Sequence, residues 1–143
     1  MKIEKEICQK IIQEMPEKPP EIGGIMGGRN GIITHLHIDR GNSNVEYCKC
    51  SYIPDTVRIN SCICEWENNN IDFYGIFHCH FGGARTLSTG DVSYIKRIMR
   101  NMPERVKKLY FPVIVLPQRE IICYYATLKN KKINFGEETI TIL

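Results

Sequence analysis

The sequence predicts an α/β fold in which a single mixed β-sheet is flanked by helices, with residues 1–143 forming one domain. Segments with apolar residues at helical spacing are separated by apolar segments of strand length. Their order is a helix, three strands, a helix, a strand, a helix and then two or three strands, which favours helices packed on one sheet. A length of 143 residues with 43% hydrophobic and 24% charged residues is typical of one globular domain with a sizeable core.

The first elements are predicted to be a helix and a hairpin. Residues 3–15 carry an apolar stripe and end at Pro16, which cannot continue a helix. Residues 22–28 form a Gly-rich strand, and residues 32–39 form the strand that returns. Asn30-Gly31 between them is typical of a tight hairpin turn. The helical stripe consists of Ile3, Ile7, Ile11, Ile12 and Met15.

The middle of the chain is predicted to form a strand, a helix and a second strand. Residues 45–52 follow a polar loop and form the first strand, and a helix runs from Pro54-Asp55 to about Glu67. Residues 71–79 are almost continuously apolar, as expected of a central strand. The stripe of this helix consists of Ile59, Cys62, Ile63 and Trp66.

The last elements are predicted to be a helix and two or three strands. The helix covers residues 89–102, and strands cover residues 109–116 and 120–128. Residues 129–132 form a charged, solvated turn, and residues 139–142 a final edge strand. The inward face of the helix consists of Val92, Ile95, Met99 and Met102.

The charge pattern argues against nucleic-acid and membrane partners. The net charge is only +3, and the basic residues are scattered with no basic block that contains aromatics. No apolar run approaches the roughly 18 residues of a membrane span, and the N-terminus has no apolar signal core. We therefore expect a cytoplasmic protein.

The seven cysteines are predicted to be reduced thiols, as is usual in a cytosolic protein. Two Cys-x-Cys pairs, Cys48/Cys50 and Cys62/Cys64, suggest a four-cysteine zinc site as an alternative. However, Cys62 and Cys64 fall in a predicted helix, where positions two apart diverge by about 200°. They cannot both face one metal ion, so we do not favour this alternative.

A His-x-His pair ends the predicted strand 71–79. Side chains two apart leave the same face of a strand, so His78 and His80 point together and Cys79 points the opposite way. Two imidazoles on one face can share a metal ion. Asp91 stands at the start of the next helix, where it can supply a third ligand.

The segment Ser88-Thr89-Gly90-Asp91 is also a capping-box pattern, and taken alone ordinary helix capping explains it best. The combination is more specific, because His-x-His, seven residues, Ser, two residues and Asp fix four positions. A second pair, His35 and His37, lacks Ser and Asp at this spacing. We interpret that pair as polar side chains on one strand face, without a metal.

The pattern resembles the signature of the JAMM metallopeptidases, also called JAB or MPN+. That family adds a glutamate just before a small-residue strand, and Glu21 occupies this place, after Pro19-Pro20 and before the Gly-rich strand. Without the downstream motif, Glu21 would be taken for a surface residue at a strand edge. Family members often carry proline after the second histidine, where this chain has Phe81, which affects the loop rather than the ligands.

The resemblance covers essentially the whole chain and implies a cytidine-deaminase-like α/β fold with one zinc ion. It assigns His78, His80 and Asp91 as zinc ligands, Glu21 as general acid/base, and Ser88 as a group that stabilises the oxyanion. It implies hydrolysis of peptide or isopeptide bonds, with a ubiquitin-like or sulfur-carrier protein or its conjugate as polypeptide substrate. Two alternatives remain: a zinc hydrolase acting on a small amide or peptide, and a non-catalytic MPN-type scaffold.

Overall fold

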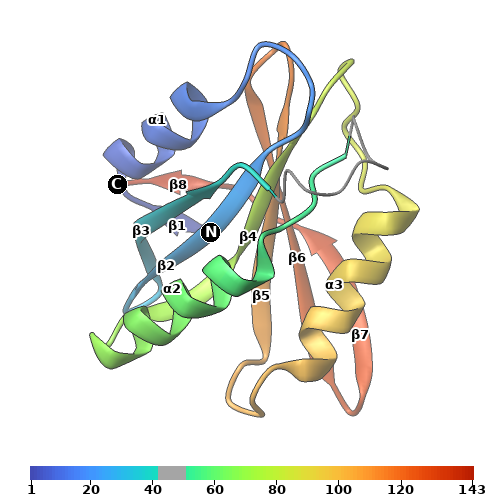
Figure 1. Cartoon of the computed structure of the whole chain (residues 1–143). Helices are drawn as coiled ribbons and strands as arrows, with labels where there is room; N and C mark the ends of the chain where they lie inside the picture. The colour runs from blue at the N-terminus through green and yellow to red at the C-terminus, as the bar shows by residue number, and fades with distance from the viewer. Residues whose placement is uncertain (42–50) are drawn as a thin grey trace.

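The computed structural model describes residues 1–41 and 51–143. Its helices are α1 (Lys5–Glu14), α2 (Thr56–Asn68) and α3 (Thr89–Asn101). Its strands are β1 (Lys2–Ile3), β2 (Gly23–Arg29), β3 (Ile32–Asp39), β4 (Asp72–His80), β5 (Lys108–Val115), β6 (Glu120–Lys129), β7 (Lys132–Glu137) and β8 (Thr141–Ile142). Figure 1 shows the arrangement.

The strands form one eight-stranded sheet in the order β7-β6-β5-β4-β2-β3-β1-β8. The sheet is mixed. Strand β4 is parallel to β5 and β1 is parallel to both neighbours, while the remaining pairs are antiparallel. Helix α3 is the connection between the parallel strands β4 and β5, as such a pair requires. The predicted α/β class with a single mixed sheet is confirmed.

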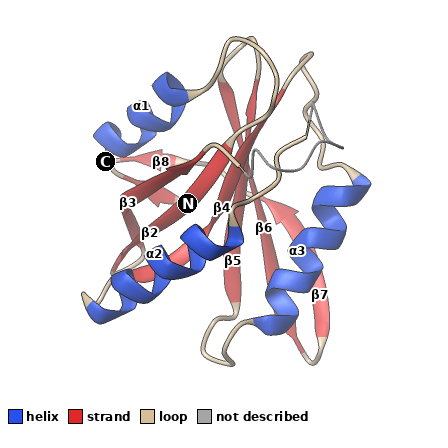
Figure 2. Ribbon diagram, viewed as in Figure 1, coloured by secondary structure: helices blue, strands red, loops and turns tan. Residues whose placement is uncertain are grey.

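Helices cover both faces of this sheet (Figure 2). Apolar residues of α1 pack with one face in a cluster that contains Met26 and Phe77. Residues of α2 and α3 pack with the other face in a cluster that contains Ile25 and Ile76. Adjacent strand residues thus point into different clusters, as strand geometry demands. Strands β2 and β4 are therefore buried on both sides, which explains their apolar and Gly-rich sequences.

Most predicted elements are confirmed within one or two residues. The turn at Asn30-Gly31 has positive φ angles of 53° and 77°, as its sequence predicts. The N-terminal helix prediction was too long, because Ile3 instead pairs in strand β1 between β3 and β8. Ile3 lies at helical spacing from the apolar residues of α1, so the sequence pattern alone does not show that the helix begins after it.

Two further differences concern strands. The predicted strand 45–52 lies mostly outside the described residues, and its described end, Ser51 and Tyr52, is not in a strand. The turn predicted at residues 129–132 is shorter, because Lys132 already begins β7, a strand that the sequence pattern does not predict. Strand β7 lies at the edge of the sheet and its side chains are mostly exposed, so its sequence has little of the apolar pattern of a strand.

No helix in the described part of the chain is long and apolar enough to cross a membrane.

Candidate metal centre

His78 and His80 lie at the carboxyl end of β4 and point to the face that α2 and α3 cover. Both are buried, with 8% and 6% of their surface exposed. Cys79 between them packs in the opposite cluster with α1, as the strand alternation predicts. Gly23 of β2 is the neighbour of His78 in the sheet.

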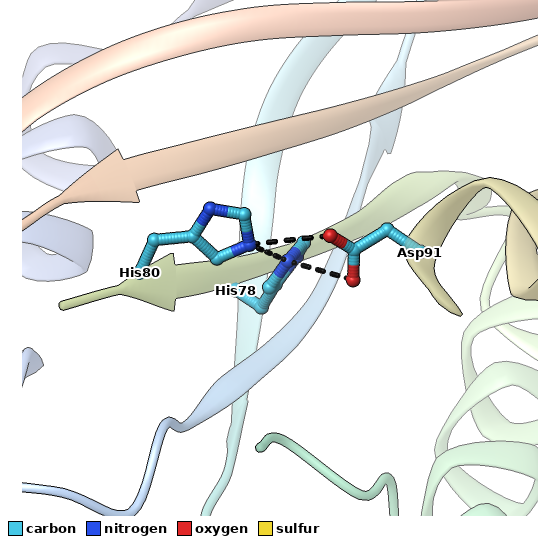
Figure 3. Close-up of side chains that lie close together, drawn as sticks. All are labelled: His78, His80 and Asp91. Atoms are coloured by element: carbon cyan, nitrogen blue, oxygen red, sulfur yellow. Dashed lines mark hydrogen bonds and ion pairs between the residues drawn. The ribbon is translucent and has the colours of Figure 1, made fainter. Parts of the chain in front are cut away.

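Asp91 comes from the first turn of α3 and reaches both imidazoles (Figure 3). Its Oδ1 atom lies 3.2 Å from Nε2 of His78, and its Oδ2 atom lies 3.2 Å from Nε2 of His80. The Oδ2 atom also accepts a hydrogen bond of 2.7 Å from the backbone N–H of Ser88, while Ser88 Oγ accepts one of 3.1 Å from the N–H of Asp91. The capping box and the histidine contacts therefore coexist, and the cap fixes the carboxylate where the imidazoles meet.

The three side chains fit a metal ion. The two Nε2 atoms lie 2.8 Å apart. Ligand atoms that each lie about 2.0–2.1 Å from a tetrahedral zinc ion are about 3.3–3.4 Å apart, so the observed spacings need only a small expansion. Two imidazole nitrogens and one carboxylate oxygen form a donor set that suits zinc among other divalent metals. Among the described residues, this is the one group of three or more His, Cys, Asp or Glu close enough to hold a metal ion.

A backbone carbonyl orients His80. Its Nδ1 atom lies 3.3 Å from the carbonyl oxygen of Ala84, which can only accept a hydrogen bond. In the neutral ring the proton therefore belongs on Nδ1, which leaves the Nε2 lone pair free for a metal ion; in the protonated ring Nε2 also carries a proton and donates to Asp91. Such a partner on the other ring nitrogen is typical of metal-binding histidines.

The electrostatics of the cluster favour a positive charge between these groups. Burial acts to raise the pKa of Asp91, but hydrogen bonds with His78 and His80 outweigh it and hold the pKa well below its usual range. The hydrogen bond with Asp91 raises the pKa of His80, against the effect of burial. The carboxylate thus stays ionised and stabilises a cation beside it.

Glu21 lines the same cleft as the His–His–Asp cluster. It immediately precedes Ile22 and strand β2 and is half-buried. Its Oε2 atom accepts a hydrogen bond of 3.3 Å from the backbone N–H of Tyr52. Burial raises the pKa of Glu21, although positive charge on His80 and His78 would lower it. A carboxylate with a raised pKa is a better proton acceptor than an exposed one.

The cleft has a volume of about 680 Å³ and extends from the cluster over an apolar floor. Ile76, Ile95 and Phe111 belong to this floor, and Tyr52 and Tyr94 also line the cleft. The sequence pattern places Ile95 on the inward face of its helix, but it assigns none of these residues to a cleft. Aromatic and aliphatic side chains that line a cleft cannot be told from core residues by their spacing.

In the described part of the chain, neither His35 and His37 nor Cys62 and Cys64 belong to a group of three or more His, Cys, Asp or Glu close enough to hold a metal ion. His35 contacts Thr34 Oγ1 through Nδ1 at 2.7 Å and packs its ring edge against Trp66. Cys62 is half-buried and Cys64 exposed on α2, as their helical spacing predicts. Cys48 and Cys50 lie outside the described residues. The described cysteines are free thiols.

Comparison with models of protein families and with curated proteins gives no match. Solved structures do match. A protein from Desulfitobacterium hafniense, determined in solution, is similar with a TM-score of 0.67 and 20% identity, over 99% of this chain and 92% of that chain. A JAB1/MPN domain protein from Archaeoglobus fulgidus is similar with a TM-score of 0.57 and 14% identity, over 100% of this chain and 99% of that one. The chain therefore has a JAB1/MPN-like fold, with a cluster of two histidines and an aspartate that could bind a metal ion.

Proposed function

We propose that the chain is a zinc-dependent hydrolase of the JAMM type, which cleaves peptide or isopeptide bonds. The observation that carries this proposal is the meeting of His78, His80 and Asp91 in one cleft that Glu21 also lines. Three protein ligands are the pattern of a catalytic zinc site, whereas structural sites use four. All five residues of the JAMM-like pattern are present, which favours an enzyme over a non-catalytic scaffold.

Each residue has a distinct task in this proposal. A zinc ion with three protein ligands would supply a bound water of pKa about 7 and would polarise the substrate carbonyl. Glu21 accepts the proton of the attacking water on its carboxylate and then gives it to the departing amine. The Tyr52 N–H holds one Glu21 oxygen in place during both transfers. Ser88 accepts from Asp91 N–H, and its own hydroxyl hydrogen remains to donate to the developing oxyanion.

For the substrate, we propose a polypeptide with a ubiquitin-like or sulfur-carrier fold, cut after its C-terminus. The JAMM-like sequence signature supports this class. The cleft volume supports keeping one alternative, hydrolysis of a small amide or peptide. A volume of about 680 Å³ lies within the roughly 300–1,000 Å³ of clefts that bind small molecules.

Metal analysis followed by a cleavage screen tests the proposal. The purified protein is expected to contain about one zinc per chain, and to cleave fusions behind the C-terminus of a ubiquitin-like protein. A chelator should abolish cleavage, and added zinc should restore it. A parallel panel of small amides tests the alternative. If the zinc-loaded protein hydrolyses neither class, the scaffold interpretation replaces the enzyme.

Replacing Ser88 separates its two tasks. We expect Ser88→Ala to lower turnover by about 10²–10³-fold through the lost oxyanion donor, and to destabilise the fold by about 1 kcal/mol through the lost helix cap. Ser88→Gly should also lose the donor, but glycine caps a helix nearly as well and the variant should keep most of the stability. Ser88→Thr should keep both. Turnover and melting temperature are measured for all three at full zinc occupancy, and normal turnover in Ser88→Gly would exclude the oxyanion role.

A further inference from the structure

We propose that Tyr52 is a positioning residue for Glu21, and that the buried carboxylate of Asp39 fixes Tyr52 for this task. This inference rests on the proposed function, because it assigns the groups that orient the proton acceptor. Neither Asp39 nor Tyr52 belongs to the JAMM-like pattern. We call the two residues the Asp39–Tyr52 brace.

Asp39 is the buried end of the brace. It ends strand β3 with only 4% of its surface exposed, and it pairs in the sheet with Gly23, whose other neighbour is His78. Its Oδ2 atom accepts 2.6 Å and 3.0 Å hydrogen bonds from the Tyr52 hydroxyl and the Asp55 N–H. A buried carboxylate destabilises a fold unless such donors satisfy it. Asp39 therefore ties Tyr52 and Asp55, which lie just before α2, to the end of the sheet.

Tyr52 spans the distance from Asp39 to the metal cluster. Its ring is nearly parallel to that of His78, at 16°, with ring centroids 6.4 Å apart. Gly23 leaves the space for this ring, since a Cβ atom there would lie 2.7 Å from Cε1 of Tyr52. The backbone N–H of the same residue donates to Oε2 of Glu21. One residue therefore contacts the general base, a metal-ligating histidine and a buried anchor.

The brace gives Glu21 a fixed orientation that its position would not provide alone. Glu21 lies outside the regular strand, just before β2, so the sheet does not hold its side chain. With one oxygen held by the Tyr52 N–H, the carboxylate loses rotational freedom before the proton transfer. Orientation of this kind lowers an activation barrier without any contact to the reacting bond. Outer partners of this kind typically change activity by about 10–100-fold when removed.

Amide hydrogen exchange at residue 52 tests the contact without any reaction. In Tyr52→Phe and in Asp39→Ala, exchange of this amide is expected to accelerate by about tenfold, because its bond to the Glu21 carboxylate opens more often. Asp39→Asn keeps an oxygen that can accept both hydrogen bonds and should stay close to the wild-type rate. Tyr74→Phe is the matched control: it removes a tyrosine hydroxyl that accepts from Gly31 N–H at the distant hairpin turn. It should leave residue 52 unchanged.

Kinetics on the zinc-loaded variants provide the second measurement. Tyr52→Phe and Asp39→Ala should lower kcat by about 10-fold or more at unchanged zinc content and KM, with rescue in Asp39→Asn. If Asp39→Ala does not fold, Tyr52→Phe carries the test alone. The brace would be overturned if the amide of residue 52 exchanged at the wild-type rate in Tyr52→Phe. It would also be overturned if kcat of Asp39→Asn were as low as kcat of Asp39→Ala. If exchange responds as expected but the wild-type protein cleaves no substrate, the proposed function fails and the brace stands.

Discussion

Replacing His78 by alanine is expected to abolish zinc binding and hydrolysis together. The Nε2 atom of His78 lies 2.8 Å from that of His80 and 3.2 Å from Oδ1 of Asp91, at the centre of the cluster. Without it, two ligands remain, and two ligands do not hold zinc against exchange with solvent. Zinc per chain, measured after dialysis against a weak chelator, should fall from about one to near zero. Turnover should fall to background in the same preparation.

The matched control is the double variant His35→Ala, His37→Ala. It removes the other His-x-His pair, of which His35 contacts Thr34 and the edge of Trp66. Some loss of stability is expected from the lost packing, but zinc content should not change. If the double variant loses half or more of the zinc while His78→Ala retains it, the metal centre has been assigned to the wrong pair.

The meeting of His78, His80 and Asp91 could be predicted because the position of each residue follows from a local rule. Strand alternation places His78 and His80 on one face and Cys79 on the other. The capping box places Asp91 at a defined position in the first turn of α3, where its carboxylate is held by the Ser88 N–H. In the structure, the carboxylate of Asp91 both caps α3 and contacts the two histidines. These two interpretations of the Ser-x-x-Asp segment were therefore not exclusive.

The Asp39–Tyr52 brace could not be predicted in this way. Its contacts join residues 13 and 31 positions apart in the chain, and they depend on how β3, β2 and β4 lie side by side. The sequence contains one indirect sign, a charged residue at the end of the apolar strand that closes the first hairpin. Such a residue is usually solvated, and only the fold shows that Asp39 is buried. Strand β7 was not predicted because its side chains are largely exposed at the edge of the sheet, so its sequence lacks the apolar pattern of a strand.

Replacing Glu21 by glutamine is expected to separate chemistry from structure. Glutamine keeps the shape of the side chain and an oxygen that can accept from the Tyr52 N–H, so the fold and the zinc content should stay unchanged. It cannot accept the proton of water, so kcat should fall by about the 10²–10⁴-fold that positioned proton transfer supplies. Glu21→Asp keeps a carboxylate on a shorter side chain and should be intermediate. Glu104→Gln, at an exposed glutamate far along the chain, should have wild-type activity.

The pH dependence of turnover gives the same prediction a second, independent measurement. A general base acts when it is ionised, so activity carried by Glu21 should rise with pH through the pKa of this residue. Burial raises that pKa, while positive charge at the His–His–Asp cluster, including that of a bound zinc ion, lowers it, so the pH at which turnover rises measures the balance of the two effects. In Glu21→Gln the residual activity should lack this rise, provided that zinc occupancy is verified at every pH because protonation of the ligands releases metal. Near wild-type cleavage by fully zinc-loaded Glu21→Gln would contradict the role of Glu21, since no other carboxylate holds the corresponding place in the JAMM-like pattern.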